Sequence, residues 1–265
     1  MTTNLTCLIL FLTAAGDWPE PRQNPQLTAI QPLAGRMAAA PEVLARFDLG
    51  RSQAALTPVA LPDGEQRALA IVAGALHCYD TSGAVRWNVH PPGLNFDSIA
   101  AVRDLEGDGK IEVLLQAGRA AMPYGAAVLV ELETGAVRWR YDVDPMSYWW
   151  QVYAGRYVPG AVHEQIIVMM HAYPPDPKNG YIALFEFPAP GAAPVQRWRY
   201  DFDQYTCFPS LLQSDLDGDG KKELVVETHS RMWFLDAETG AVKHFVQWDV
   251  SPGNVRSYGL IRFVD

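Results

Sequence analysis

The sequence has little cysteine, with three cysteines in 265 residues. Cys7 lies in an apolar N-terminal stretch, and Cys78 and Cys207 stand far apart in hydrophobic or aromatic surroundings. Their spacing matches no zinc motif. We therefore expect two buried thiols, Cys78 and Cys207, rather than a disulfide or a zinc site.

Positive charge is also scarce, because 21 Lys and Arg face 30 Asp and Glu, and the formal net charge is −9. Binding to nucleic acid depends on clustered Lys and Arg, so this balance argues against such a partner. The commonest meaning of a net negative charge is solubility. Where the acids cluster in loops, they also suit bound cations.

Long hydrophobic runs are missing. The longest, from about Leu5 to Ala15, is too short to span a bilayer. It ends in the small residues Ala14, Ala15 and Gly16. This order is typical of a secretory signal peptide, although the first six residues contain no Lys or Arg. We expect a secreted, periplasmic or cell-surface protein with no transmembrane span.

Long stretches of helical apolar periodicity are absent as well. The chain instead has 21 Gly, 20 Pro and 11% aromatic residues, a composition that favours β-strands joined by many turns. With 49% hydrophobic and 19% charged residues, it is ordinary for a globular protein. We expect an all-β fold.

The sequence repeats a short ending. Three glycines, Gly83, Gly135 and Gly240, are each followed by Ala-Val and a basic residue, in "YDTSGAVRWNV", "ELETGAVRWRYDV" and "LDAETGAVKHFVQW". A fourth copy, "VQRWRYDFD" from Val195, keeps its Trp198 but replaces the tight turn with "FPAPGAAP". Alternating strands around a glycine turn predict a β-hairpin.

A second hairpin precedes the first and in two units carries an acidic loop. These loops are "DLEGDGKIE", Asp104 to Glu112, and "DLDGDGKKE", Asp215 to Glu223. Two further units, from Val59 and Val152, keep the strands but lose the acids, and in the second of them Glu164 alone matches the last carboxylate. Four-stranded repeats of roughly 50 residues predict the blades of a β-propeller.

The repeats also divide the chain. We expect a signal peptide at 1–16, an extended linker or capping arm at 17–42, and propeller repeats at 43–265, with blades at about 51–95, 96–146, 147–206 and 207–256. Val43 to Gly50 resembles the outermost strand of a blade, and Tyr258 to Asp265 resembles the first strand of another. The prediction is an incomplete propeller of about four blades plus part of a fifth, 257–265.

The acidic loops resemble the FG-GAP or VCBS repeats of integrin-like and bacterial extracellular propellers. The Gly-Ala-Val-Arg-Trp endings also resemble repeats of the quinoprotein type of propeller. The resemblance covers most of residues 43–265 and implies bound calcium. Ca²⁺ prefers six to eight oxygen ligands at about 2.3–2.6 Å, which carboxylates and main-chain carbonyls supply. The predicted ligands are Asp104, Glu106, Asp108, the carbonyl of Lys110 and Glu112, and Asp215, Asp217, Asp219, the carbonyl of Lys221 and Glu223.

The spacing differs from that of an EF-hand, which needs a bidentate glutamate at its twelfth position. That position holds Leu115 in the first loop and Val226 in the second. The alternative to a metal is a pair of solvated Asp-Gly turns. If metal binds, crowded carboxylates and the absence of an evident open position predict a structural role.

Other residues have plainer interpretations. His171 and His229 end equivalent strands, where a structural hydrogen bond is the usual role of a lone histidine. The aromatic run Tyr148 to Tyr153 could stack on a sugar, but its alternation fits an inner strand packed between blades. Trp87, Trp139 and Trp198 recur at equivalent positions, which favours core.

No catalytic constellation stands out in the sequence. We therefore expect a calcium-stabilised binding or adhesion module for a protein or carbohydrate ligand. The alternative is an enzyme on the same scaffold, either a polysaccharide lyase or a quinoprotein dehydrogenase, because the fold by itself does not decide function.

Overall fold

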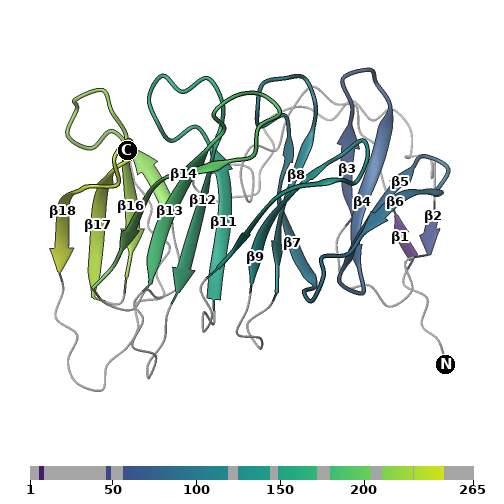
Figure 1. Ribbon diagram of the computed structural model, residues 1–265, viewed down its shortest axis with the longest axis horizontal. Coiled ribbons are helices and arrows are strands. Elements are labelled where there is room, and N and C mark those ends of the chain that lie inside the picture. The colour runs from purple at the N-terminus through teal and green to yellow at the C-terminus, as the bar shows by residue number, and fades with distance from the viewer. Residues whose placement is uncertain are drawn as a thin grey trace, which may run out of the picture.

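A computed structural model describes residues 6–8, 46–48, 56–118, 125–143, 149–171, 180–203, 211–228 and 230–247. In these ranges the chain forms strands β1 to β18 and no helix, and sixteen of the strands make four antiparallel sheets of four. The sheets stand side by side, from β3–β6 at the right of Figure 1 to β15–β18 at the left. These sheets are the blades of a β-propeller, as the repeats predicted.

Each blade is a meander of four consecutive strands. Blade 1 consists of β3 (Thr57–Ala60), β4 (Gln66–Val72), β5 (Ala75–Asp80) and β6 (Val85–Val89). Blade 2 consists of β7 (Phe96–Arg103), β8 (Glu112–Ala117), β9 (Ala126–Glu131) and β10 (Val137–Asp142). Blade 3 consists of β11 (Trp149–Gly155), β12 (Gln165–His171), β13 (Tyr181–Glu186) and β14 (Val195–Asp201). Blade 4 consists of β15 (Leu211–Ser214), β16 (Glu223–Glu227), β17 (Arg231–Asp236) and β18 (Val242–Gln247).

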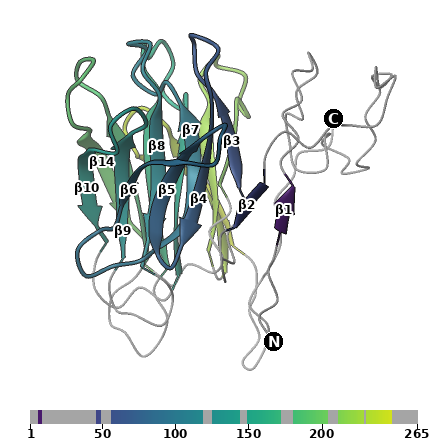
Figure 2. The ribbon, with the colours of Figure 1, turned by 90° about the vertical axis from the view of Figure 1, so that its right-hand side faces the viewer.

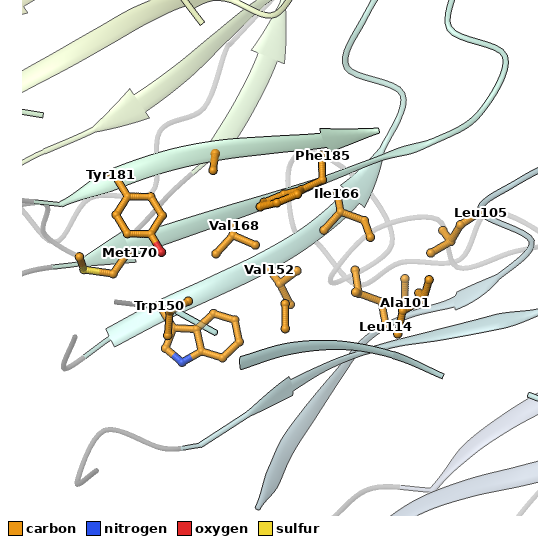
Figure 3. Packing of buried hydrophobic residues seen from close by; sticks show 14 of the residues in the cluster. Ala101, Leu105, Leu114, Trp150, Val152, Ile166, Val168, Met170, Tyr181 and Phe185 are labelled. Carbon is orange, nitrogen blue, oxygen red and sulfur yellow. The ribbon is translucent and has the colours of Figure 1, made fainter. Parts of the chain in front are cut away.

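The middle strands of blades 2 and 3 are buried on both faces because these two sheets each pack between two other blades. Val113, Leu114 and Leu115 follow one another on β8, and all three are fully buried. Between blades 2 and 3, Leu114 and Ala101 lie opposite Val152 and Ile166 (Figure 3). Burial on two faces explains why these strands read as continuous apolar runs rather than as an alternation.

A tryptophan fastens one blade to the next at two junctions. Trp87 of blade 1 donates a hydrogen bond from Nε1 to the Leu132 carbonyl at 2.9 Å, and its ring lies against Gly135. Trp198 of blade 3 does the same toward blade 4, with the Ala237 carbonyl at 3.1 Å. The hairpin turn of the following blade therefore needs a glycine, because a side chain there would enter the indole.

The junction between blades 2 and 3 differs. Trp139 packs edge-on against Phe185, with ring centroids 5.1 Å apart. Blade 3 is the blade whose hairpin turn reads "FPAPGAAP" in place of the short glycine turn. Trp139 therefore packs against the core between blades 2 and 3, as predicted, but with a different partner.

The fourth strand of every blade contains a bulge. Its register against the third strand shifts so that one residue is skipped. In blade 2, Val137 pairs with Val130 and Trp139 with Leu129, so Arg138 lies between the two pairs. The skipped residue is basic each time: Arg86, Arg138, Arg197 and Lys243. A bulge re-aims its side chain, so each blade directs one basic residue out of the regular alternation.

Two short strands lie beside blade 1 (Figure 2). β1 (Thr6–Leu8) pairs with β2 (Arg46–Asp48) in a separate two-stranded sheet. The segment that resembled an outermost blade strand thus pairs outside the four blades. The linker at 17–42 and the partial blade at 257–265 lie outside the described residues. The part of the chain that the structure describes contains no helix with the length and hydropathy of a membrane span.

Cys78 lies on β5, fully buried between blades 1 and 2. It is a free thiol, and burial raises its pKa to about 11. A thiol in this environment is a core residue, as predicted. Cys207 lies outside the described residues.

Candidate metal centre in the acidic loops

The loop from Asp215 to Glu223 joins β15 to β16 in blade 4. Asp215 closes it, since its Oδ1 accepts a hydrogen bond from the Gly218 amide at 2.8 Å and its Oδ2 from the Gly220 amide at 3.0 Å. Gly218 and Gly220 have φ angles of +76° and +82°. These angles lie in the left-handed region, which explains the two glycines of the motif.

The backbone of this loop also fixes one oxygen of each of its other three carboxylates. The amide of Asp219 donates to Asp217 Oδ1 at 3.2 Å, and the amide of Lys221 donates to Asp219 Oδ1 at 2.8 Å. Glu223 Oε2 accepts a hydrogen bond from the Leu216 amide at 2.8 Å. The second oxygen of each carboxylate is thereby held in a set direction.

Those second oxygens converge on Lys243, the bulge residue of β18. Lys243 Nζ lies 2.8 Å from Asp217 Oδ2, 3.2 Å from Asp219 Oδ2 and 2.6 Å from Glu223 Oε1. Hydrogen bonding to Lys243 holds the pKa of Asp217 below its ordinary value, and the bonds to Asp217 and Glu223 raise the pKa of Lys243. The loop therefore forms a preorganised cation site, and the chain's own ammonium group lies in it.

The loop from Asp104 to Glu112 has the same backbone. Asp104 accepts hydrogen bonds from the amides of Gly107 at 2.6 Å and Gly109 at 2.8 Å. Glu112 Oε2 accepts one from the Leu105 amide at 2.9 Å. The shared motif thus produces a shared turn in blades 2 and 4.

The cation of this first loop is Arg138, the bulge residue of β10. Arg138 Nη1 lies 2.6 Å from Glu106 Oε1 and 3.5 Å from Glu112 Oε1. Both glutamates have side chains that are 0% exposed, and these two oxygens accept no hydrogen bond, so they depend on the charge of Arg138. Glu106 Oε2 accepts a hydrogen bond from the Gly191 amide of blade 3. The longer side chain that replaces the aspartate of the second loop therefore reaches the next blade.

Glu112 has a perturbed pKa. Burial raises it to about 7, and the nearby Glu106 and Asp108 add to the effect, while the Leu105 amide and Arg138 oppose it. Such a pKa is common in catalytic acids. Since Glu112 is fully buried and its other oxygen is bound to its own loop, we attribute the shift to the packing of the loop.

The second loop fits a metal ion better than the first. Asp215, Asp217 and Glu223 offer oxygens within 4.8 Å of one another, and the two aspartates are exposed. Within the described residues no second group of acids meets in this way. Calcium at both loops stays a prediction, and the geometry favours Asp215 to Glu223.

Lys110 and Lys221 were predicted to bind metal through their main-chain carbonyls, and their side chains point to other partners. Lys110 and Lys221 extend their ammonium groups toward Glu131 and Glu238, at 3.6 Å and 3.8 Å. Their side chains therefore do not compete for the carboxylates of the loops. Lys243 and Arg138 do, and the sequence pattern alone assigns neither of them a role in the loops.

Glu164, the only residue of the blade 3 loop that matches a carboxylate of the motif, forms an ion pair with blade 2. It receives Arg103 of blade 2 at 2.7 Å, and its amide donates to the Leu105 carbonyl at 3.0 Å. Arg103 also donates to the Ala154 carbonyl at 2.9 Å. The degenerate loop is thus tied to blade 2 by an ion pair.

Of the other candidates, Trp150 is buried in the core between blades 2 and 3, so it packs as predicted. His171 ends β12, and His229 and Tyr148 lie outside the described residues.

No family model and no curated protein matches the chain, so the resemblance to FG-GAP or VCBS repeats stays a prediction. Among solved structures, the exotype rhamnogalacturonan lyase YesX is 16% identical with a TM-score of 0.47, over 72% of this chain and 40% of that one. BamB from Moraxella catarrhalis is 16% identical, with a TM-score of 0.40, over 75% of this chain and 54% of that one. The Dos1 propeller is 16% identical, with a TM-score of 0.43, over 77% of this chain and 52% of that one. The chain thus spans about half the length of these proteins, and likeness at this level does not extend to activity or ligands.

Proposed function

We propose that this chain is a calcium-stabilised, extracytoplasmic β-propeller that acts as a binding or adhesion module for a protein or carbohydrate ligand. The observation that carries the metal assignment is the convergence of three carboxylate oxygens, from Asp217, Asp219 and Glu223, on one point in the loop. Asp215 and the Lys221 carbonyl complete the proposed ligand set. Loop Asp104 to Glu112 is the second, weaker candidate.

Calcium suits this set because all the donors are hard oxygens on a short loop. The carboxylates of Asp217 and Asp219 are 51% and 44% exposed, so water can fill the remaining ligand positions. Exposed sites of this kind bind weakly, with dissociation constants of roughly 10⁻⁴–10⁻³ M in extracellular modules. A site outside the cytoplasm is consistent with that range and with the signal-peptide pattern of residues 1–16.

A structural role for the metal follows from how the acids are bonded. In both loops the carboxylates accept hydrogen bonds from their own backbone and contact a basic side chain of the same blade. General acids and bases need an oxygen that can reach a substrate, and the glutamates of the two loops, Glu106, Glu112 and Glu223, are buried. We therefore favour binding over catalysis, with the ligand contacted by other surfaces of the propeller.

Calcium is expected to raise the melting temperature of the protein. At about 5 mM Ca²⁺, a site of this affinity stabilises the fold by about 1–2 kcal/mol. For a chain of this size the melting temperature should rise by about 3–6 °C relative to excess chelator, as measured by circular dichroism.

The paired variant Asp217→Asn with Asp219→Asn serves as the control, because it removes two converging oxygens that are exposed and outside the core. It should melt at the same temperature with calcium and with chelator. A calcium-dependent rise of equal size in this variant would assign the metal to another place, and an unchanged wild-type curve would remove the metal from the proposal.

A further inference from the structure

The cation site of the second loop is already filled by a residue of the chain. Each converging oxygen, on Asp217, Asp219 and Glu223, is within 3.2 Å of Lys243 Nζ. A calcium ion would need the same oxygens at about 2.3–2.6 Å. The ammonium group and the metal therefore require the same place.

We propose that Lys243 is a built-in competitor for this site, so that a divalent cation enters the loop by displacing Lys243 from it. The inference rests on the proposed function, since it concerns the same metal site. Lys243 then has a regulatory role. Without metal, its ammonium group holds the carboxylates of the loop together, and its ion pairs set the metal concentration needed to displace it.

Lys243 can leave the loop for solvent. Its side chain is 29% exposed and stands on β18, five of whose six residues are exposed. Lysine carries a compact charge on a flexible four-carbon stem, and water solvates the ammonium group strongly. Leaving the loop therefore costs little beyond the ion pairs, which the metal replaces with a doubly charged ion.

In the first loop the basic residue is held much more firmly. Arg138 stands at the equivalent bulge, but it is 15% exposed and lies between two glutamates that are 0% exposed. Removing its charge would leave those carboxylates buried and unpaired, which is far more costly. The two loops thus share a motif, while lysine makes the second site easier for a metal to enter than the first, where Arg138 is held between buried carboxylates.

The test is a calorimetric titration of the metal-free protein with calcium chloride. Lys243→Met should bind calcium about tenfold more tightly than the wild type, because the competing charge is gone. Lys222→Met is the matched control, since Lys222 is an exposed lysine of the same loop, and its affinity should stay within about twofold of the wild type. Wild-type binding with no gain in Lys243→Met would overturn the inference and leave the proposed function standing. If neither protein bound calcium, both would fail.

A second measurement uses the unmodified protein. Lysine acylation by an N-hydroxysuccinimide ester, followed by mass spectrometry, reports how free each ammonium group is. At saturating calcium, Lys243 should react several-fold faster than in chelator, while Lys222 should react at the same rate in both. Equal or slower labelling of Lys243 in a sample that binds calcium would show that the metal does not displace it.

Discussion

Replacing Arg138 by methionine is expected to lower the free energy of unfolding by about 3–5 kcal/mol in metal-free buffer. The substitution keeps the apolar stem but removes the charge that faces Glu106 and Glu112, both fully buried. Two carboxylates would then remain in the core without a cation. Urea denaturation followed by tryptophan fluorescence measures the loss.

The matched control is Arg140→Met, two residues further along β10. Arg140 pairs at 2.6 Å with Asp142, whose side chain is 65% exposed, so this loss should stay within about 1 kcal/mol. A triple variant that adds Glu106→Gln and Glu112→Gln to Arg138→Met should recover part of the stability, because no buried charge is left. If the triple variant were no more stable than Arg138→Met, unpaired charge would not be the cause.

Replacing Gly240 by alanine is the second large effect that we expect. The new Cβ would lie 2.6 Å from the indole of Trp198, a buried ring that joins blade 3 to blade 4. Alanine in the left-handed region costs about 1–2 kcal/mol, and overpacking of the ring adds about 1–3 kcal/mol. The free energy of unfolding should therefore fall by about 2–5 kcal/mol.

Gly93→Ala separates these two costs. Gly93 has a φ of +74°, against +73° for Gly240, but a Cβ there would meet no atom within 4 Å. It should lose the backbone cost alone. Equal losses for the two variants would mean that Trp198 moves aside without penalty, and that the tryptophan contact does not hold the blades together.

The repeats were sufficient to predict the fold. Glycine turns recur with a fixed ending, and a hairpin depends on residues that are close in the sequence, so its strands can be recognised locally. The tryptophan contact was predicted as core, but its partner was not. Trp87 and Trp198 bind the turns of the following blades, 45 and 39 residues further along the chain.

The sequence pattern could not predict which basic side chain contacts each acidic loop, and the reason is physical. Arg138 and Lys243 stand on the fourth strands of their blades, and a regular strand register would not direct them toward the acidic loops. A bulge on β10 and on β18 turns each of them toward the carboxylates. The basic residue after each Gly-Ala-Val was visible in the repeat, and it was the available signal. The structure shows that the bulge brings this basic residue beside the acidic loop.

Glu106 was likewise predicted as a ligand because it occupies the place of Asp217. Its extra methylene lets it accept the Gly191 amide of blade 3, a partner 85 residues away. The two loops differ at two positions, Glu106 against Asp217 and Ile111 against Lys222, and the first of these differences provides the contact between the first loop and blade 3. The sequence shows the difference, but not the residue that it reaches.

A crystal structure of the protein grown at saturating calcium would show directly whether calcium replaces Lys243 in the second loop. We expect an ion between Asp217, Asp219 and Glu223, with oxygens at about 2.3–2.6 Å, and Lys243 turned toward solvent. A structure at the same calcium concentration with Lys243 Nζ still among these three carboxylates, and no ion in the loop, would contradict it.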